Sequence, residues 1–253
     1  MPTALITGAS SGIGAEAARA AAARGYSVAL LGRRRSELES VRESLLPVIG
    51  GDHHCVPCDV TEASSVDSAI QKILAEMEVP EAVITSAGVC HPAAIAQTTP
   101  ELWDQTVAVN LTGTFLVARS AAMAITAARR TGSFVLVGSE QSLIGVPNYT
   151  AYAATKAGLV GLTRALAAEL APDIRVNLLC PGPVDTPMLH AEFALTDDPD
   201  RTRAEEIRRV PLRRIATAAE TAEAALWLLQ DATYSTGSLL SLDGGTTGAF
   251  AAT

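Results

Sequence analysis

The feature that most constrains the fold is a glycine-rich turn close to the start of the chain. A short apolar run over residues 3–7 leads into Gly8-Ala-Ser-Ser-Gly12-Ile-Gly14, and an alanine-rich helical stretch follows. Such a turn between a strand and a helix lets the backbone approach a pyrophosphate, whose charge lies at the helix N-terminus. A glycine turn alone could simply reverse the chain, but this placement favours dinucleotide binding in an α/β fold.

Further apolar runs alternate with helical stretches, and this alternation predicts a parallel sheet with helices on both faces. We expect one domain over residues 1–253, a doubly wound, open, Rossmann-like α/β sheet of about seven strands. Residues 187–214 are charged and contain no expected strand, so they form either a lid over the substrate or a surface helical excursion. The six later strands are expected at residues 27–31, 53–57, 82–85, 133–137, 174–179 and 238–242.

Composition narrows the class of protein. Of the 253 residues, 48% are hydrophobic and 18% are charged, which is enough to cover both faces of a sheet. The net charge of −8 gives no electrostatic basis for binding nucleic acid. We see no apolar run of membrane-spanning length and no signal peptide, so we expect no membrane partner and a cytoplasmic location.

One cysteine pair resembles a metal or redox motif. Cys55 and Cys58 have the Cys-x2-Cys spacing. They fall on an expected strand, where side chains alternate, so they point to opposite faces. We therefore expect no metal site there.

The clearest chemical pattern is Tyr152-Ala-Ala-Thr-Lys156, preceded by Ser139. On a helix, positions i and i+4 share a face, so the Lys156 ammonium can lie beneath the Tyr152 hydroxyl. A nearby ammonium favours the phenolate and lowers the tyrosine pKa, which suits acid–base work near neutrality. Ser139 could donate a hydrogen bond to a carbonyl oxygen. The alternative is an amphipathic helix with a buried aromatic and a solvated lysine.

The end of the second expected strand carries Gly32 followed by Arg33, Arg34 and Arg35. An NAD enzyme usually has a carboxylate at this corner, for the ribose 2′-hydroxyl. Three cations and no carboxylate favour a 2′-phosphate, hence NADP(H), with NAD(H) as the alternative. The arginines could instead belong only to the first turn of the next helix, although cations are unfavourable there.

The motifs together resemble the short-chain dehydrogenase/reductase family in its single-domain form, essentially from end to end. That resemblance implies an oxidoreductase acting on CH–OH groups with NAD(P), on a small carbonyl or alcohol substrate. The matching motifs are the glycine turn with Thr7, Asp59-Val60, Ala87-Gly88, Asn110, Ser139, Tyr152-x3-Lys156, Pro181-Gly182 with Thr186, and Asp243-Gly-Gly245.

The resemblance implies a role for each catalytic residue. Tyr152 would be the general acid in carbonyl reduction and the base in alcohol oxidation. Lys156 would lower the tyrosine pKa and bind the nicotinamide ribose, and Ser139 would hold the substrate oxygen. Asn110 would anchor a water that relays protons from Lys156; within a helix, an asparagine is otherwise a local cost.

The cofactor residues also follow from the resemblance. A Gly-Arg corner such as Gly32-Arg33 is typical of members that use NADP. One departure is Thr85-Ser86, where the family usually has Asn-Asn, and we expect a modest effect on cofactor positioning. The implied contacts, besides Tyr152 and Lys156, are Gly8, Ser10, Ser11, Gly12, Ile13, Gly14, Arg33, Asp59, Val60, Ser86, Ala87, Gly88, Pro181, Gly182, Val184 and Thr186.

Assembly is a further implication of the resemblance. Most members are homotetramers or homodimers, often assembled through the helices that correspond to residues 109–129 and 152–170. We therefore expect a homotetramer or a homodimer.

Polar residues near the expected pocket suggest a polar or hydroxylated substrate. They are Glu140, Gln141, His91 and His190. The alternative is that these side chains face solvent or an oligomer interface. A rival function is reduction of a 3-oxoacyl group on acyl carrier protein, with Arg129-Arg130 meeting the acidic carrier, although these arginines also suit the end of a helix.

A non-catalytic NADP-binding sensor or scaffold would need only the glycine turn and Arg33. The intact set of Asn110, Ser139, Tyr152 and Lys156 argues against it.

Overall fold

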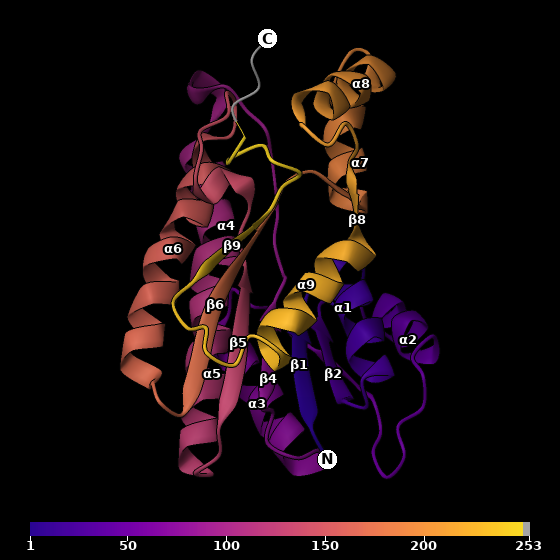
Figure 1. Ribbon diagram of the computed structural model, residues 1–253, viewed down its shortest axis with the longest axis vertical. Helices are drawn as coiled ribbons and strands as arrows, with labels where there is room; N and C mark the ends of the chain where they lie inside the picture. The colour runs from indigo at the N-terminus through magenta and orange to yellow at the C-terminus, as the bar shows by residue number, and fades with distance from the viewer. Residues whose placement is uncertain (250–253) are drawn as a thin grey trace.

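The sheet runs through the centre of the molecule, which is described here from a computed structural model over residues 1–249 (Figure 1). Its seven strands are all parallel, in the order β3-β2-β1-β4-β5-β6-β9. The predicted doubly wound α/β sheet is confirmed. The strands are β1 Thr3–Thr7, β2 Ser27–Gly32, β3 His54–Pro57, β4 Ala82–Thr85, β5 Gly132–Val137, β6 Ile174–Pro181 and β9 Leu239–Leu242.

Helices cover both faces of the sheet. One core packs α1, α2 and α9 against the strands, and the other packs α3, α5 and α6. Alternate strand residues supply the two cores: Ile6 belongs to the first and its neighbour Leu5 to the second, both fully buried. The helices are α1 Gly12–Ala23, α2 Arg35–Glu43, α3 Ala63–Glu76, α4 Pro100–Val107, α5 Gly113–Ala127, α6 Thr150–Leu170, α7 Pro187–Ala194, α8 Pro199–Arg209 and α9 Ala218–Gln230.

The cysteine pair behaves as strand alternation predicts. Cys55 packs against the core that contains α1 and α2, whereas Cys58 is buried in the other core. Their thiols therefore do not converge on one face of β3.

The helical run between β4 and β5 is not a continuous α-helix. Between α4 and α5 the chain makes one π-helical segment, Ala108–Thr112, that contains Asn110. The whole run, Pro100–Ala127, is long and apolar enough by composition to cross a membrane, contrary to the sequence expectation. Half of its most apolar 18-residue window is buried in this structure, because α5 packs against the sheet as a core helix.

The carboxyl ends of the parallel strands meet at one edge of the sheet, and α7 and α8 rise over that edge (Figure 1). Both helices lie within residues 187–214. A short parallel pair, β7 Val184–Asp185 and β8 Ala216–Thr217, closes the base of the excursion. The segment therefore leaves and rejoins the fold at one place, beside the strand ends.

Candidate active site

Tyr152 and Lys156 lie in the first turns of α6 and share a face, as their spacing predicts. The Lys156 Nζ lies 5.4 Å from the centre of the Tyr152 ring. Lys156 is 5% exposed, and its ammonium donates a 2.8 Å hydrogen bond to the carbonyl of Val137, at the end of β5. The buried cation is thereby held at the strand edge next to the phenol.

The charge states differ from the sequence expectation. Burial lowers the pKa of Lys156 to about 8. Burial also raises the pKa of Tyr152, and the nearby Cys90 and Glu192 raise it further, while the Ser139 hydroxyl opposes the shift. The predicted lowering of the tyrosine pKa by Lys156 is therefore wrong for this structure, because desolvation is the largest effect on the phenol. Tyr152 is a protonated acid here.

Ser139 is placed by the tight 3₁₀ turn Glu140–Ser142 that follows β5. Its hydroxyl oxygen accepts a 3.2 Å hydrogen bond from the backbone N–H of Gln141, and its own N–H donates to the Ser142 hydroxyl. Since the Ser139 oxygen is held as an acceptor, its hydrogen is free to point toward Tyr152 or toward a substrate oxygen.

Asn110 is fully buried in the π-helical segment. Its side chain accepts from the Val89 N–H at 2.9 Å and donates to the Val89 carbonyl at 2.9 Å. It also donates to Thr155 at 3.3 Å, and Thr155 donates to the Tyr152 carbonyl at 2.7 Å. The polar residue that is a local cost in a helix thus ties the loop after β4 to the turn of α6 that carries Tyr152.

A cavity of about 290 Å³ lies along the glycine turn and the adjoining strand ends. Gly8 and Gly12 adopt φ of +66° and +54°, which L side chains rarely adopt. A Cβ on Gly14 would lie 2.4 Å from the Gly8 carbonyl, so only glycine fits there. Of the residues predicted to bind cofactor, this cavity is lined by Gly8, Ser10, Ser11, Gly12, Ile13, Arg33, Asp59, Val60, Ser86, Ala87, Gly88 and Thr186.

The start of α1 fits a pyrophosphate. Within the described residues, its N-cap Ser11 makes no side-chain capping hydrogen bond, and the first turn carries no acidic residue. The backbone N–H groups of that turn are therefore available to an anion. A pyrophosphate is therefore the ligand favoured by the sequence motif, by the positive φ angles and by the uncapped helix.

The arginine corner lines the same cavity through Arg33 and Arg34. Arg34 donates to the Ser10 hydroxyl at 2.8 Å and lies 3.5 Å from Glu37. In the described part of the chain Arg33 has no ion pair. Its positive charge contributes to the lowered pKa of Asp59, which is caused first by hydrogen bonding to Thr61. Arg34, another of the three cations at this corner, is thus a second positive charge beside the glycine turn.

The departure at Thr85-Ser86 has a visible consequence. The Thr85 hydroxyl is buried with no hydrogen-bond partner among residues 1–249. The loop is instead fixed by the Ala87 N–H, which donates to the Thr7 hydroxyl at 3.1 Å. Backbone contacts therefore hold this part of the cavity wall.

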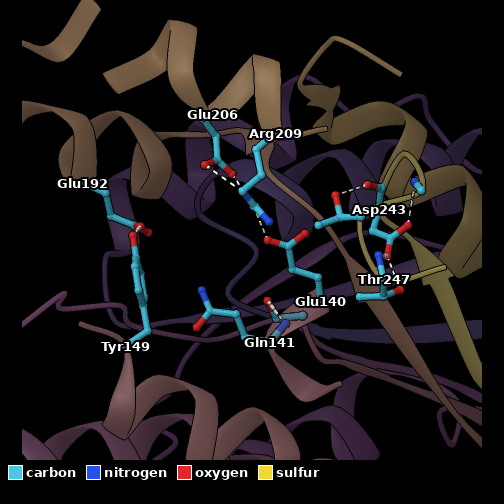
Figure 2. A network of polar contacts seen from close by, with 11 residues as sticks. Glu140, Gln141, Tyr149, Glu192, Glu206, Arg209, Asp243 and Thr247 are labelled. Carbon is cyan, nitrogen blue, oxygen red and sulfur yellow. Dashed lines mark hydrogen bonds and ion pairs between the residues drawn. The ribbon is translucent and has the colours of Figure 1, made fainter. Parts of the chain in front are cut away.

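A second, adjoining cavity of about 400 Å³ contains Tyr152, Lys156 and Ser139 and is lined by the predicted cofactor residues Pro181, Gly182 and Val184. Gly14, also predicted to bind cofactor, lines neither cavity in the described part of the chain. Pro181 is the last residue of β6, Gly182 follows it, and Val184 begins β7. A Cβ on Gly182 would lie 2.9 Å from the Asp243 Cα. The Asp243 carboxylate in turn accepts from the Thr247 N–H at 2.8 Å (Figure 2).

Two of the four predicted substrate residues line this second cavity, namely Glu140 and Gln141. His91 is exposed, and His190 is paired with Asp185 at 2.6 Å on the surface. Over the described residues, neither histidine lines the cavity, so the substrate contact predicted for them lacks a geometric basis. His91 is close in sequence to the Ala-Gly turn, and His190 lies in the segment 187–214, but both side chains face outward.

The cavity wall contains side chains that sequence reasoning missed. The Tyr149 hydroxyl donates to Glu192 of α7 at 2.8 Å (Figure 2). The Tyr149 ring meets the Tyr152 ring edge-on, with 6.4 Å between the ring centres. No cation or base stands one turn beyond Tyr149, so its position in the sequence signals no role. Arg209 of α8 bridges Glu140 and Glu206, the latter at 2.5 Å. No local spacing signals pairs this distant in the chain.

This chain is similar to known proteins over nearly its whole length. A family model described as enoyl-(acyl carrier protein) reductase matches residues 8–247. The chain belongs to the short-chain dehydrogenase/reductase family. It is 33% identical over 244 residues to a 2-(S)-hydroxypropyl-CoM dehydrogenase of Xanthobacter autotrophicus, covering 96% of this chain and 95% of that protein. It is 32% identical to the 3-oxoacyl-[acyl-carrier-protein] reductase FabG of Chlamydia trachomatis, covering 96% of each chain.

Solved structures of short-chain dehydrogenase/reductases have the same architecture. A short-chain type dehydrogenase/reductase of Mycobacterium marinum matches with a TM-score of 0.91 at 31% identity, covering 98% of this chain and 96% of that one. A variant of actinorhodin polyketide ketoreductase with NADPH matches with a TM-score of 0.89 at 31% identity, covering 98% of both chains. The chain is therefore an oxidoreductase of this family, with its seven-stranded Rossmann-like sheet.

Proposed function

We propose that this protein is an NADP(H)-dependent oxidoreductase that interconverts a small carbonyl compound and the corresponding secondary alcohol, with Tyr152 as general acid and base. The observation that carries the proposal is the junction of the two cavities. Ile13, Ser86, Gly88, Thr186 and Met188 line both the cavity along the glycine turn and the cavity that contains Tyr152. A dinucleotide laid on the turn would therefore end at the wall next to the phenol.

The chain's own groups suit proton transfer at a carbonyl. A bound nicotinamide cofactor would supply the hydride. Tyr152, protonated in this environment, gives its proton to the carbonyl oxygen as the oxygen gains charge. Ser139 donates a hydrogen bond to the same oxygen, and the Lys156 cation stabilises the phenolate that remains. In alcohol oxidation the phenolate takes the proton back. Asn110 would anchor the water that returns protons to Lys156.

Arg33 supports NADP(H) over NAD(H) within this proposal. It lines the cofactor cavity at the end of β2, where Gly32 stands in place of a carboxylate. A guanidinium pairs well with a 2′-phosphate. The NADPH-bound ketoreductase, similar over 98% of this chain, agrees with that preference.

Reduction of a carrier-bound 3-oxoacyl group is the alternative, because FabG proteins are among the relatives. The proposed carrier contact, Arg129-Arg130, argues against it. These arginines follow the end of the 15-residue helix α5, and Arg130 lies 3.8 Å from Glu81, just before β4. They stand at the amino edge of the sheet, about 20 Å along α5 from the strand ends. A carrier bound there would face away from the substrate cavity.

We extend the proposal to organisation and location. Residues 1–253 form one NAD(P)-binding domain, although residues 250–253 lie outside the described part, and residues 187–214 act as the substrate lid. Trp103, Phe115 and Met123 are 40–58% exposed on α4 and α5, which supports a homodimer or homotetramer through these helices. We also propose a cytoplasmic location.

The test pairs cofactor binding with turnover. Wild-type protein and Tyr152→Phe are titrated with NADPH by nicotinamide fluorescence, then assayed for NADPH oxidation with apolar, hydroxylated and thioester-linked carbonyl compounds. We expect equal NADPH affinity and a loss of roughly 10²–10⁴-fold in turnover for Tyr152→Phe. Tyr149→Phe removes the neighbouring phenol and should lose far less. Equal turnover by wild type and Tyr152→Phe would contradict the proposal.

A further inference from the structure

The substrate cavity carries polar atoms that nothing in the described protein satisfies. The Oε1 atom of Gln141 is buried there with no hydrogen-bond partner among residues 1–249. Glu192 accepts the Tyr149 hydroxyl on Oε2 and a hydrogen bond from the Cys90 thiol, which leaves lone pairs of this carboxylate for further donors. Figure 2 shows the Gln141 amide in the space between the Tyr149–Glu192 pair and Glu140. The unused groups facing this space are hydrogen-bond acceptors.

The cations that line the same cavity are already engaged. Arg209 is held between Glu140 and Glu206, and Lys156 donates to the Val137 carbonyl. An anionic substrate would therefore meet carboxyl groups around a guanidinium that Glu140 and Glu206 already neutralise. A wholly apolar substrate would cover Gln141 and Glu192 and leave their acceptors without donors. The occupant that matches is a molecule carrying hydrogen-bond donors.

Hydroxyl groups match better than ammonium groups. Burial raises the pKa of the Glu192 carboxyl, while the Tyr149 hydroxyl and the Cys90 thiol act in the opposite direction. A substrate hydroxyl can pair with either charge state of this carboxyl, as donor to the carboxylate or as acceptor from the acid. An ammonium pairs only with the carboxylate, so it tolerates the environment less well.

We propose that Glu192 and Gln141 are specificity-determining residues, and that the substrate is a hydroxylated ketone, or the corresponding polyol, with hydroxyls near the reacting carbon. The hydroxyls donate to Glu192 and Gln141 while the reacting oxygen lies between Tyr152 and Ser139. The inference rests on the proposed function. In the reducing direction the carbonyl π bond breaks, hydride from NADPH bonds to carbon, the Tyr152 proton bonds to oxygen, and NADP⁺ forms.

The test uses four-carbon ketones that differ in one respect each. These are butanone, which is apolar; 1-hydroxybutan-2-one, with one hydroxyl; erythrulose, with three; and acetoacetate, which is anionic. The kcat/KM of each is measured with NADPH for wild type, Glu192→Leu and Gln141→Leu. Glu205→Gln, a change at an exposed residue of α8 paired with Arg201, is the control.

We expect wild type to prefer erythrulose over butanone by about 100-fold, since a site built to bind hydroxyls rejects analogues that lack them. Glu192→Leu should lower kcat/KM for erythrulose at least tenfold, through KM more than kcat, and leave butanone within twofold. Gln141→Leu should act in the same direction with a smaller effect. Acetoacetate should be the poorest ketone for wild type and should improve in Glu192→Leu.

The failures are distinguishable. If wild type prefers butanone or acetoacetate, or if Glu192→Leu lowers all four ketones equally, the specificity role is wrong while the proposed function stands. The same conclusion follows if all four fail and another carbonyl compound is reduced. If no carbonyl compound oxidises NADPH, although NADPH binds, the proposed function fails and this inference fails with it.

Discussion

The two halves of the crevice are built in different ways. The cofactor half is formed by backbone at positive φ, by an uncapped helix start and by strand ends, with glycines where any Cβ would collide. The substrate half is formed by side chains that meet across long sequence separations. Tyr149 reaches Glu192 across 43 positions, and Arg209 reaches Glu140 across 69.

This difference separates what the fold requires from what the substrate requires. The glycine turn serves the sheet and the pyrophosphate at once, so few sequences satisfy it. The side chains of the second cavity can change without altering the sheet. Substitutions in the two halves should therefore affect different properties, and the following three tests probe that separation.

The largest effect is expected at the ion pair between α8 and the 3₁₀ turn that follows β5. Arg209→Met leaves the buried Glu140 carboxyl without its cation, and we expect a loss of about 3 kcal/mol in the free energy of unfolding. Glu140→Gln combined with Arg209→Met should recover more than half of it. Urea unfolding measures all three proteins, with exposed Arg208→Met as control. Additive losses in the double variant would contradict the pairing.

The pH dependence of Arg209→Met sharpens this test. Burial already raises the pKa of Glu140, and Arg209 opposes that shift. Without Arg209 the folded protein holds a proton at a higher pH than the unfolded chain does. A group with a raised folded pKa stabilises at low pH and loses that contribution as pH rises. The stability deficit of Arg209→Met should therefore shrink as pH falls toward the ordinary carboxyl range.

The next effect concerns the cofactor half. Arg33→Ala should weaken NADPH binding by roughly 10–100-fold. This range corresponds to the loss of one hydrogen bond to a charged group, which contributes about 1.5–3 kcal/mol. NADH binding should change little. Arg35→Ala is the matched control, because Arg35 pairs with Glu39 on the surface at 3.8 Å. Nicotinamide fluorescence titration gives both affinities. An equal loss for NADPH and NADH would mean that Arg33 does not contact the 2′-phosphate.

The smallest effect concerns Lys156 and the way the free energy of unfolding changes with pH. The folded pKa of Lys156 is about 8, below the ordinary lysine value of about 10.4. Between these values the unfolded chain binds more protons, so Lys156 makes the wild type gain stability with rising pH. Relative to Lys156→Met, that gain should approach about 1 kcal/mol per pH unit from pH 8 to 10. Lys72→Met, at an exposed position, is the control. A constant difference across this range would contradict the lowered pKa.

The sequence predicted the features that depend on local spacing. Seven strands, the glycine turn and the shared face of Tyr152 and Lys156 follow from periods and offsets within a few residues. The π-helical segment around Asn110 did not, because it interrupts a pattern that reads as one helix.

Features that depend on tertiary burial could not be predicted in the same way. The raised pKa of Tyr152 comes mainly from desolvation, which only the packed fold supplies. The loop after β4 turns His91 outward, and His190 lies on the exposed side of α7, while α7 and α8 bring Glu192 and Arg209 to the cavity. Two of the four residues predicted to contact substrate, Glu140 and Gln141, therefore line the cavity, and the two histidines do not.

The central claim is that a hydride crosses between the two halves of the crevice. The most direct measurement uses NADPH carrying deuterium at both C4 positions, with the best carbonyl substrate found for the wild type, and mass spectrometry of the product. The account predicts one deuterium on the carbinol carbon, with none entering that carbon from heavy water when the NADPH is unlabelled. A product that takes its label from solvent, or that forms without oxidation of NADPH, would contradict hydride transfer and indicate proton chemistry alone.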